Sequence, residues 1–366
     1  MQSAHLKTRY RIAQRQAGAA LLAAMLTVTL VATFAAAALW QQWRSVEIET
    51  AERARVQASW ILTGALDWSR LILREDGRAG GADHLGEPWA VPLNEARLSS
   101  FLAVDKNASD TEREAFLSGQ VIDLQSRLNV SNLAGGGGSS KAAMDAFARL
   151  FTQLGLPQEQ LITLQTSLIG AAPDPLPAGS ATAPNSKAQP ASTGTATPPA
   201  AASSAPAAQL APNAPVANAL GLLMPERVDQ LAWLGLPRET LTALGPYITL
   251  LPTRTKVNLN TAGAEVIAAS TPGLGMADAQ RAVTLRDRQH FVSLADANSR
   301  MGGVQPIFDG AEHDISSQFF EVTGQLRLEQ TIVQERSVLQ RNGLQVTTIW
   351  RDHGVVIGPP ATGSRP

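Results

Sequence analysis

Side chains that usually carry chemistry are sparse in this sequence of 366 residues. The patterns that bind zinc (His-Glu-x-x-His), cradle phosphate (Gly-x-x-x-x-Gly-Lys) or present a serine nucleophile (Gly-x-Ser-x-Gly) do not occur in it. The sequence has no cysteine, which excludes thiolate metal sites, a cysteine nucleophile and disulfide bonds. Its five histidines are scattered, at His5, His84, His290, His313 and His353. We therefore expect no catalytic and no cofactor-binding residue, and no enzyme.

One loose group of carboxylates fits a metal ion. Asp309, Glu312 and Asp314 lie close together in the sequence, and carboxylate oxygens are ligands that Ca²⁺ prefers. A solvated acidic surface accounts for the same residues more simply. Calcium is therefore the one cofactor that the sequence allows, with these three carboxylates as candidate ligands.

Residues 257–288 contain a pattern that could contact nucleic acid. An Asn-x-Asn-Thr-Ala segment is followed by Pro-Gly-Leu-Gly at 272–275 and a helical pattern through Arg288. It looks like a helix-hairpin-helix, whose glycine-rich turn offers backbone N–H groups to phosphate. The nearby cations exceed the carboxylates by only about two, being Arg254, Lys256, Arg281, Arg286, Arg288 and Arg300 against Glu265, Asp278, Asp287 and Asp296. A structural turn is favoured, and a membrane-anchored DNA-binding protein stays the alternative.

The N-terminus is a candidate for processing. A basic leader without acidic residues precedes Gly18, and the next twenty or so residues, from Ala19 to Leu39, carry no charge. At ~1.5 Å per residue that run can span a ~30 Å hydrocarbon core, with the positive leader on the cytoplasmic side and the rest exported. The leader's four cations are Lys7, Arg9, Arg11 and Arg15.

Three fates of this segment are open. It can remain an uncleaved anchor, or be cut as a signal peptide near Ala35-Ala36-Ala37. A cut between Gly18 and Ala19 would instead remove the leader and keep the apolar helix, which resembles the leader of type IV pilins and type II secretion pseudopilins. Pilins usually carry Glu at the fifth mature position, where this chain has Ala23. Loss of the leader would change the net charge from −1 to about −5, which does not favour nucleic-acid binding.

A single long helix is predicted to organise the chain. No proline interrupts residues 19–75, and Gly77, Gly80 and Gly81 are expected to end the helix after roughly 55 residues, or ~80 Å. Apolar residues recur at helical spacing in its second half. This stripe is expected to pack on a sheet or globular head, and its members are Trp60, Ile61, Gly64, Trp68, Leu71 and Ile72.

The residues after this helix carry a more specific resemblance. A Leu-Gly-Glu-Pro-Trp-Ala segment is followed by a strand predicted over 120–133 with an Asp-x-Gln-x-Arg-x-Asn-x-x-Asn-Leu pattern. We expect Asp123 to pair with Arg127, and Asn129 and Asn132 to cap turns. Together with the N-terminal helix, this signature is similar to that of minor pseudopilin K of the type II secretion system, a family that usually lacks the fifth-position Glu. Its residues are Glu87, Trp89, Asp123, Gln125, Arg127, Asn129 and Asn132.

The resemblance implies a function and partners. It implies a non-enzymatic minor pseudopilin at the tip of the periplasmic pseudopilus, in a single-pass protein of the bacterial inner membrane. The implied partners are minor pseudopilins I and J, other pseudopilins, the inner-membrane assembly platform, and the prepilin peptidase that cuts between Gly18 and Ala19. A minor pilin of a true type IV pilus is a further alternative.

A large all-helical insertion is predicted at residues 134–314. Helical patterns cover 141–168 and 216–252, and Leu-Gly-Leu-Pro recurs at Leu154 and Leu234, which suggests two repeated helix-hairpin-helix or SAM-like units. Between them, residues 171–218 are an Ala/Pro/Ser/Thr spacer that is expected to be disordered.

The C-terminal residues 315–354 are predicted to return to β-structure. Strands are expected over 318–328 and 331–339, a hairpin at Asn342-Gly343, and a last strand with Leu344, Val346, Thr348 and Trp350 on one face. These strands would join the one near Asp123 in a single antiparallel sheet. The expected fold is thus α+β and pilin-like, over 19–133 and 315–354, followed by a disordered tail at 355–366.

Overall fold

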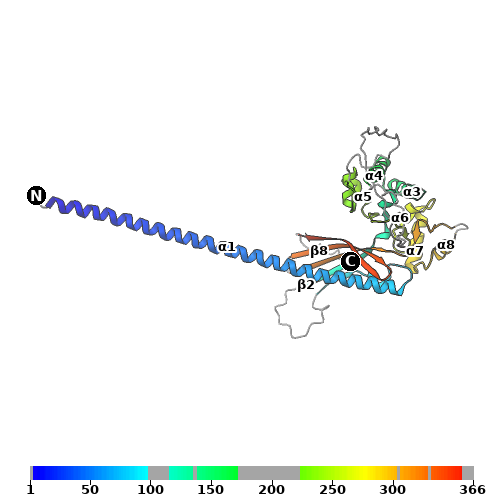
Figure 1. Ribbon diagram of the computed structural model, residues 1–366, viewed down its shortest axis with the longest axis horizontal. Helices are drawn as coiled ribbons and strands as arrows, with labels where there is room; N and C mark the ends of the chain where they lie inside the picture. The colour runs from blue at the N-terminus through cyan, green and yellow to red at the C-terminus, as the bar shows by residue number, and fades with distance from the viewer. Residues whose placement is uncertain are drawn as a thin grey trace, which may run out of the picture.

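The computed structural model describes residues 3–97, 115–134, 138–171, 223–302, 306–328 and 331–356, with the side chains of α1 placed from Ala19 onward. The predicted spacer lies outside these residues apart from Ala171, and so does the predicted tail from residue 357 onward. One helix, α1 (Ser3–Ala79), is 77 residues long. Figure 1 shows its first half projecting away from a head in which the sheet and the insertion lie at the other end of the helix.

The helix is longer than predicted, since it includes the leader and continues through Gly77. It ends at Ala79 because Gly80 and Gly81 adopt φ values of 66° and 116°, which only glycine takes readily. Two of the three predicted stop signals are therefore confirmed.

The face of α1 that packs on the sheet is different from the predicted one. Ala58, Leu62, Leu66 and Leu73 are buried and follow helical spacing, whereas Trp60 and Trp68 are 73 % and 63 % exposed. The predicted packing of the Trp60 stripe is wrong for the tryptophans. The helix carries apolar residues on two faces, and the face with smaller side chains fits the close approach to the sheet.

The sheet has five antiparallel strands in the order β1-β2-β7-β8-β9. Their bounds are β1 Leu93–Arg97, β2 Ala115–Asp123, β7 Phe319–Leu328, β8 Thr331–Asn342 and β9 Gln345–Val356. β2 pairs with β7 from Ala115↔Leu328 to Asp123↔Phe320, which confirms that the early strand joins the C-terminal ones. The β8–β9 hairpin turns at Gly343, with φ 59°, also as predicted.

One strand prediction needs correction, and one strand, β1, has no counterpart among the predictions. The strand expected over 120–133 stops at Asp123, where β2 ends. The Asp123 carboxylate accepts the Gln125 backbone N–H at 2.7 Å, which turns the chain into the 3₁₀ helix η2 (Leu124–Ser126).

Both faces of the sheet are used. On the α1 side, Leu66 and Leu73 of the helix pack with Trp89, Phe320, Val322, Leu339 and Val346. On the opposite side, Val338 and Phe319 pack with Leu124 and Leu251, and Trp350 lies against them. A register shift pairs Leu339 with Thr348 but Val338 with Trp350, which leaves an extra residue in β9. This bulge turns Trp350 to the face opposite Val346, so the prediction that 344, 346, 348 and 350 share one face is wrong.

The insertion consists of short helices. They are η3 (Val130–Ala134), α3 (Gly138–Gln153), α4 (Gln158–Ala171), η4 (Val228–Leu234), α5 (Arg238–Leu244), α6 (Ala264–Ser270), α7 (Met276–Arg288) and α8 (Leu294–Met301). Two parallel pairs tie them together, β3 (Leu128–Asn129) with β4 (Ile248–Thr249) and β5 (Val257–Asn258) with β6 (His313–Asp314). A fourth 3₁₀ helix within the described residues, η1 (Pro88–Ala90), precedes β1.

The predicted helices over 141–168 and 216–252 are both interrupted. Gly155 and Gly235, with φ 68° and 94°, each precede a Leu-Pro pair that starts a new helix. The helix predicted to end at Arg288 is confirmed as α7.

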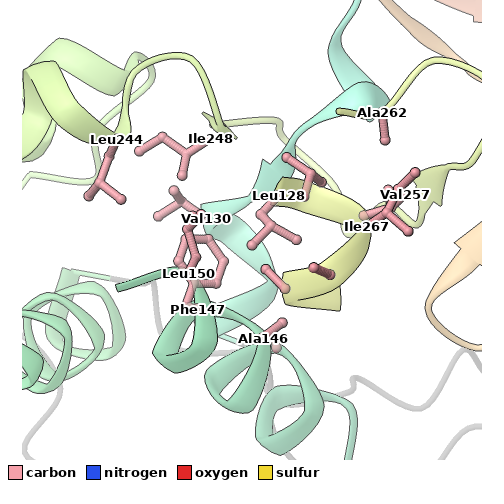
Figure 2. Close-up of a cluster of buried hydrophobic side chains, with 14 of the residues drawn as sticks. Leu128, Val130, Ala146, Phe147, Leu150, Leu244, Ile248, Val257, Ala262 and Ile267 are labelled. Carbon is pink, nitrogen blue, oxygen red and sulfur yellow. The ribbon is translucent and has the colours of Figure 1, made fainter. Parts of the chain in front are cut away.

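One hydrophobic core joins the parts of the insertion on both sides of residue 172. Figure 2 shows Leu128, Val130, Phe147, Leu150 and Ile248 meeting in it. Because Leu128 and Val130 belong to this core, the insertion begins to pack before residue 134, directly after the sheet strand β2.

Candidate site: a polar junction between helix, sheet and insertion

Glu87 and Trp89 fix the chain that follows α1. The Glu87 carboxylate accepts the backbone N–H of His84 at 3.0 Å and the indole N–H of Trp89 at 2.7 Å. Trp89 is 2 % exposed and meets the ring of Phe320 edge-on, with centroids 5.2 Å apart. Burial raises the pKa of Glu87 to about 7, against the effect of the two hydrogen bonds. Both residues thus attach the loop to the sheet.

Arg341 of β8 connects this loop to the end of α1. Its guanidinium pairs with Asp76 of α1 and with Asp83, and donates to the Ser317 carbonyl oxygen at 2.9 Å. Burial raises the pKa of Asp83 to about 6, although Arg341 opposes that shift. Oxygen atoms of Asp76, Asp83 and Glu87 lie within 4.8 Å of one another. The Arg341 cation already pairs with two of the three carboxylates, so the arrangement is an internal ion network.

Asp123 is the centre of a second buried network. One carboxylate oxygen accepts the Gln125 N–H, and the other accepts from Thr261 Oγ1 (2.5 Å), Ser317 Oγ (2.6 Å) and Asn258 Nδ2 (3.1 Å). Burial raises the pKa of Asp123 despite these bonds. The predicted Asp123–Arg127 pair is wrong, since every bond of Asp123 goes to a neutral donor.

Gln125 holds the two ends of the insertion together. Its side-chain oxygen accepts the Gln318 N–H at 2.7 Å, and its amide nitrogen donates to the Lys256 carbonyl oxygen at 3.3 Å. Gln318 immediately precedes β7, and Gln125 follows the end of β2. The Gln125 side chain therefore links the point where the chain leaves the sheet to the point where it returns.

Asn129 and Asn132 bind the segment 251–255. The Asn129 amide donates to Thr253 O at 2.8 Å, and its oxygen accepts the N–H groups of Ser131 and Leu251. Asn132 donates to Thr255 O at 2.8 Å and accepts its N–H at 3.2 Å. The signature residues therefore form a polar junction between sheet and insertion. Arg127 differs from them, since its guanidinium has no hydrogen bond or ion pair within the described residues.

His313 superficially resembles a catalytic base. Its Nε2 lies 3.0 Å from Ser270 Oγ and 3.1 Å from Thr271 Oγ1, and its Nδ1 lies 3.2 Å from the Asp309 carbonyl oxygen. That oxygen only accepts, so Nδ1 carries the proton and Nε2 accepts from the hydroxyls. Burial lowers the pKa of His313 to about 4, and the ring is 1 % exposed. A ring without solvent access and with two competing hydroxyls is a structural element.

The three candidate calcium ligands do not converge on a single point. Asp309 accepts the Ala311 N–H at 3.1 Å, and Asp314 accepts the Ile315 N–H at 2.8 Å and lies 3.6 Å from Lys256 Nζ. Burial raises the pKa of Glu312. Within the described residues, these three carboxylates do not gather as Asp76, Asp83 and Glu87 do.

Two of the cations counted for the DNA-binding alternative serve the interior. Arg286 is 8 % exposed and donates to the carbonyl oxygens of Leu259 and Ala262. Arg300 donates to Leu285 O at 2.7 Å and lies over the Phe291 ring. Lys256 faces Asp314, as described above. The hairpin therefore presents fewer cations to phosphate than its sequence suggests.

The N-terminal part of α1 is long and apolar enough to cross a membrane. Within the described residues, one helix segment, Ala19–Ala79, meets this test, with a mean hydropathy of 2.2 in its most apolar window, none of which is buried. Gly18, Ala19 and Ala23 lie on this helix. Farther along α1, Val56, Trp60, Trp68 and Leu71 form an exposed apolar face. Their exposed fractions are 55, 73, 63 and 38 %.

Comparisons with known proteins agree with this architecture. Residues 126–253 and 257–316, together more than half of the chain, match two family models that are both described as type II secretion system (T2SS), protein K. A type II secretion system protein K from Pseudomonas aeruginosa is 24 % identical over 324 residues, which cover 86 % of this chain and 85 % of the relative.

A solved structure has the same fold. The crystal structure of the GspK-GspI-GspJ complex from enterotoxigenic Escherichia coli contains a chain that is 14 % identical to this one, with a TM-score of 0.55. The match covers 83 % of this chain and 98 % of that chain, which share a mixed helix-and-sheet fold. The chain therefore belongs to the protein K family of the type II secretion system, whose members are minor pseudopilins.

Proposed function

We propose that this protein is a non-enzymatic subunit at the tip of the periplasmic pseudopilus that exports folded proteins. The observation that carries the proposal is the exposed apolar face at Val56, Trp60, Trp68 and Leu71, on the same helix whose opposite face packs on the sheet. A monomer gains nothing from exposing two tryptophans, whereas a bundle of helices would bury them.

This face is suited to another helix. Gly64 lies between the two tryptophans at helical spacing. Apart from its chain neighbours and the backbone of its own helix, no atom of the described residues lies within 4 Å of the position where its Cβ would be. A small residue between two large ones lets a second backbone approach closely while the rings flank it. The solved relative is in a complex with GspI and GspJ. We infer that minor pseudopilins I and J are the corresponding partners here, beside other pseudopilins and the inner-membrane assembly platform.

The N-terminal half would hold the protein in the bacterial inner membrane before assembly. We infer that the leader stays cytoplasmic, that the prepilin peptidase cuts between Gly18 and Ala19 and that the new N-terminus is methylated. A fifth-position Glu is expected to meet the subunit above it in the filament. With Ala23 there instead, the subunit is best placed with nothing above it.

The insertion supports the tip position through its bulk. It extends beyond the end of the sheet in Figure 1, where a regular filament would leave little room. We infer that its two Leu-Gly-Leu-Pro turns, with glycines at φ 68° and 94°, mark a duplicated SAM-like unit. Calcium binding by Asp309, Glu312 and Asp314 stays a proposal that a bound partner or loop would have to complete.

The test is co-purification of the full chain with minor pseudopilins I and J after joint expression in membranes. Trp60→Asp and Trp68→Asp place a charge on the exposed face, where neither side chain contributes to the fold. We expect each variant to keep the wild-type melting temperature and to lose most of the co-purified partner. The matched control is Trp233→Asp, at a tryptophan of similar exposure (58 %) on the insertion.

Retention of both partners by the Trp60 and Trp68 variants would overturn the proposed interface. Loss of partners in the Trp233 variant alone would move the interface to the insertion. Binding of duplex DNA with a steep salt dependence would instead support the helix-hairpin-helix alternative.

A further inference from the structure

A polar cavity of about 730 Å³ lies on the face of the sheet opposite α1. Its walls come from η2, the segment 226–233, α5 and the strands β7 to β9. A more apolar cavity of about 520 Å³ adjoins it, and the two share Glu226, Leu250, Val338 and Trp350 in their walls. We call the two together the junction cleft. Its size matches that of ligand sites, and its two ends differ in chemistry.

Within the described residues, the wall of the polar end carries four arginines and four carboxylates, and one of the arginines, Arg127, has no direct anionic partner. The arginines are Arg127, Arg227, Arg238 and Arg336, and the carboxylates are Glu226, Asp229, Glu321 and Asp352. Arg336 donates to Glu321 at 2.5 Å, and Arg227 donates to Asp352 at 3.0 Å. Arg127 lines the same cavity, half-buried, with no direct partner among the described residues. Glu321 and, to a smaller extent, Asp123 are the anions that act on it, and the Glu321 carboxylate is already bound by Arg336. In the part of the chain that the structure describes, Arg127 therefore lines the cleft without an ion pair of its own.

Burial of the charged Arg127 guanidinium costs free energy unless an anion compensates its charge. Burial lowers the pKa of its guanidinium, and Arg336 lowers it further. The six other signature residues all bond within the junction or the loop after α1, so Arg127 is the one whose side chain is left available. A planar guanidinium in a partly dry wall is suited to a carboxylate, which it can bind through two parallel hydrogen bonds.

The apolar end determines what surrounds that carboxylate. Leu250, Leu251, Val338 and Ile349 line it together with Trp350. The guanidinium groups of Arg227 and Arg336 both lie over the Trp350 ring, with their central carbons 4.9 and 5.5 Å from its centroid. This stacking holds the ring between the two ends of the cleft. An occupant must therefore combine an anion with apolar groups over a length that two adjoining cavities provide.

We propose that the junction cleft binds a peptide carboxylate flanked by apolar side chains, with Arg127 as its anion-binding group. The carboxylate can belong to the end of a polypeptide or to an acidic side chain within it. This site lies on the face of the sheet away from the α1 interface and does not depend on the pseudopilin function proposed above.

The experiment measures fluorescence anisotropy of labelled peptides with the full chain in detergent micelles. The probes are fluorescein-Gly-Ser-Leu-Val-Phe with a free C-terminal carboxylate, the same peptide as its C-terminal amide, and the amide with Glu in place of Val. We expect the free-acid peptide, the Glu-containing amide or both to bind at least ~10-fold more tightly than the neutral amide. The neutral amide has no carboxylate to form a charged hydrogen-bonded pair with Arg127. Tighter binding of the free-acid peptide would identify a C-terminal carboxylate as the ligand, and tighter binding of the Glu-containing amide would identify an acidic side chain.

Substitutions in the cleft test whether the peptide carboxylate binds at Arg127. Arg127→Gln is expected to abolish the preference for the charged peptide, and Arg127→Lys to retain part of it. The control Arg238→Gln removes an exposed cation from the rim of the same cavity and should keep the preference. Thr242→Trp, at an exposed position in the wall, should block all three peptides and serves where an Arg127 variant unfolds.

Several results would overturn the proposal. It fails if the wild-type chain binds the charged and neutral peptides alike, or binds none of them at millimolar concentration. It also fails if the charge preference survives in a folded Arg127→Gln variant. Unchanged binding in the Thr242→Trp variant would place the peptides outside the cleft.

Discussion

His84 and His290 stack face to face, with ring centroids 3.8 Å apart and planes inclined by 7°. The first belongs to the loop after α1 and the second to the turn after α7, so the stack joins the pilin-like part to the insertion. His84 Nδ1 accepts the Gly86 backbone N–H at 3.1 Å. Burial lowers the pKa of His84, and the neighbouring His290 lowers it further, while Asp76 opposes both.

The stack should make this junction sensitive to acid. The folded-state pKa of His84 lies below 6.5, so its contribution to stability is present above pH 6.5 and is lost as the pH falls below that value. After correction for the slower intrinsic amide exchange at low pH, the protection factors of residues 83–90 and 289–292 should therefore fall several-fold between pH 7 and pH 5.5.

The control is His84→Phe, which keeps an aromatic ring and removes the charge. The raised pKa values of Asp83 and Glu87, about 6 and about 7, act in the opposite direction, because the folded state retains their protons. Comparison with the variant isolates the histidine, since both carboxylates remain in it. An equal acid-induced loss of protection in the two proteins would contradict this role of the stack.

The contact between α1 and the sheet depends on a glycine. A Cβ atom at Gly324 would lie 3.1 Å from Cδ2 of Leu62, which is 2 % exposed. Gly324→Ala should therefore destabilise the fold by ~1–3 kcal/mol through overpacking, and Leu62→Ala should cost ~2–5 kcal/mol through the cavity it leaves. Denaturant unfolding of the double variant should give less than the sum of the two losses. Strict additivity would show that the two side chains do not compete for space.

The Asp123 network should be the most sensitive polar feature of the junction. Asp123→Ala leaves the side-chain donors of Thr261, Ser317 and Asn258 without their acceptor, so we expect a loss of ~3–5 kcal/mol in the free energy of unfolding. Asp145→Ala, at an exposed position on α3, is the matched control and should change stability by less than ~0.5 kcal/mol. A small effect of Asp123→Ala in chemical unfolding would argue that the network is dispensable.

The sequence could predict what depends on local rules. Gly80 and Gly81 stop α1, Asn342-Gly343 turns the hairpin, and alternation marks β7 and β8, because each of these signals acts within a few residues. The family signature likewise identified residues that meet in one junction.

The features that the sequence could not predict depend on the whole fold. Both faces of α1 carry apolar residues, so periodicity could not tell the sheet-facing Leu62 from the exposed Trp60. The bulge that turns Trp350 away from Val346 appears only when β8 and β9 pair. The Arg341–Asp83 pair joins residues 258 positions apart, and no spacing rule indicates it. The same holds for the cavity around Arg127, whose walls come from distant segments.

A pseudopilin of this family should be processed at its N-terminus before it assembles. The most direct measurement is intact-mass and N-terminal mass spectrometry of the full chain after co-expression with a prepilin peptidase. We expect a mature protein that begins at Ala19 and carries an N-terminal methyl group, with a Gly18→Trp variant left uncut as the control. An uncut chain beginning at Met1, or a cut beyond Ala35, would contradict it and would favour an anchor or a signal peptide.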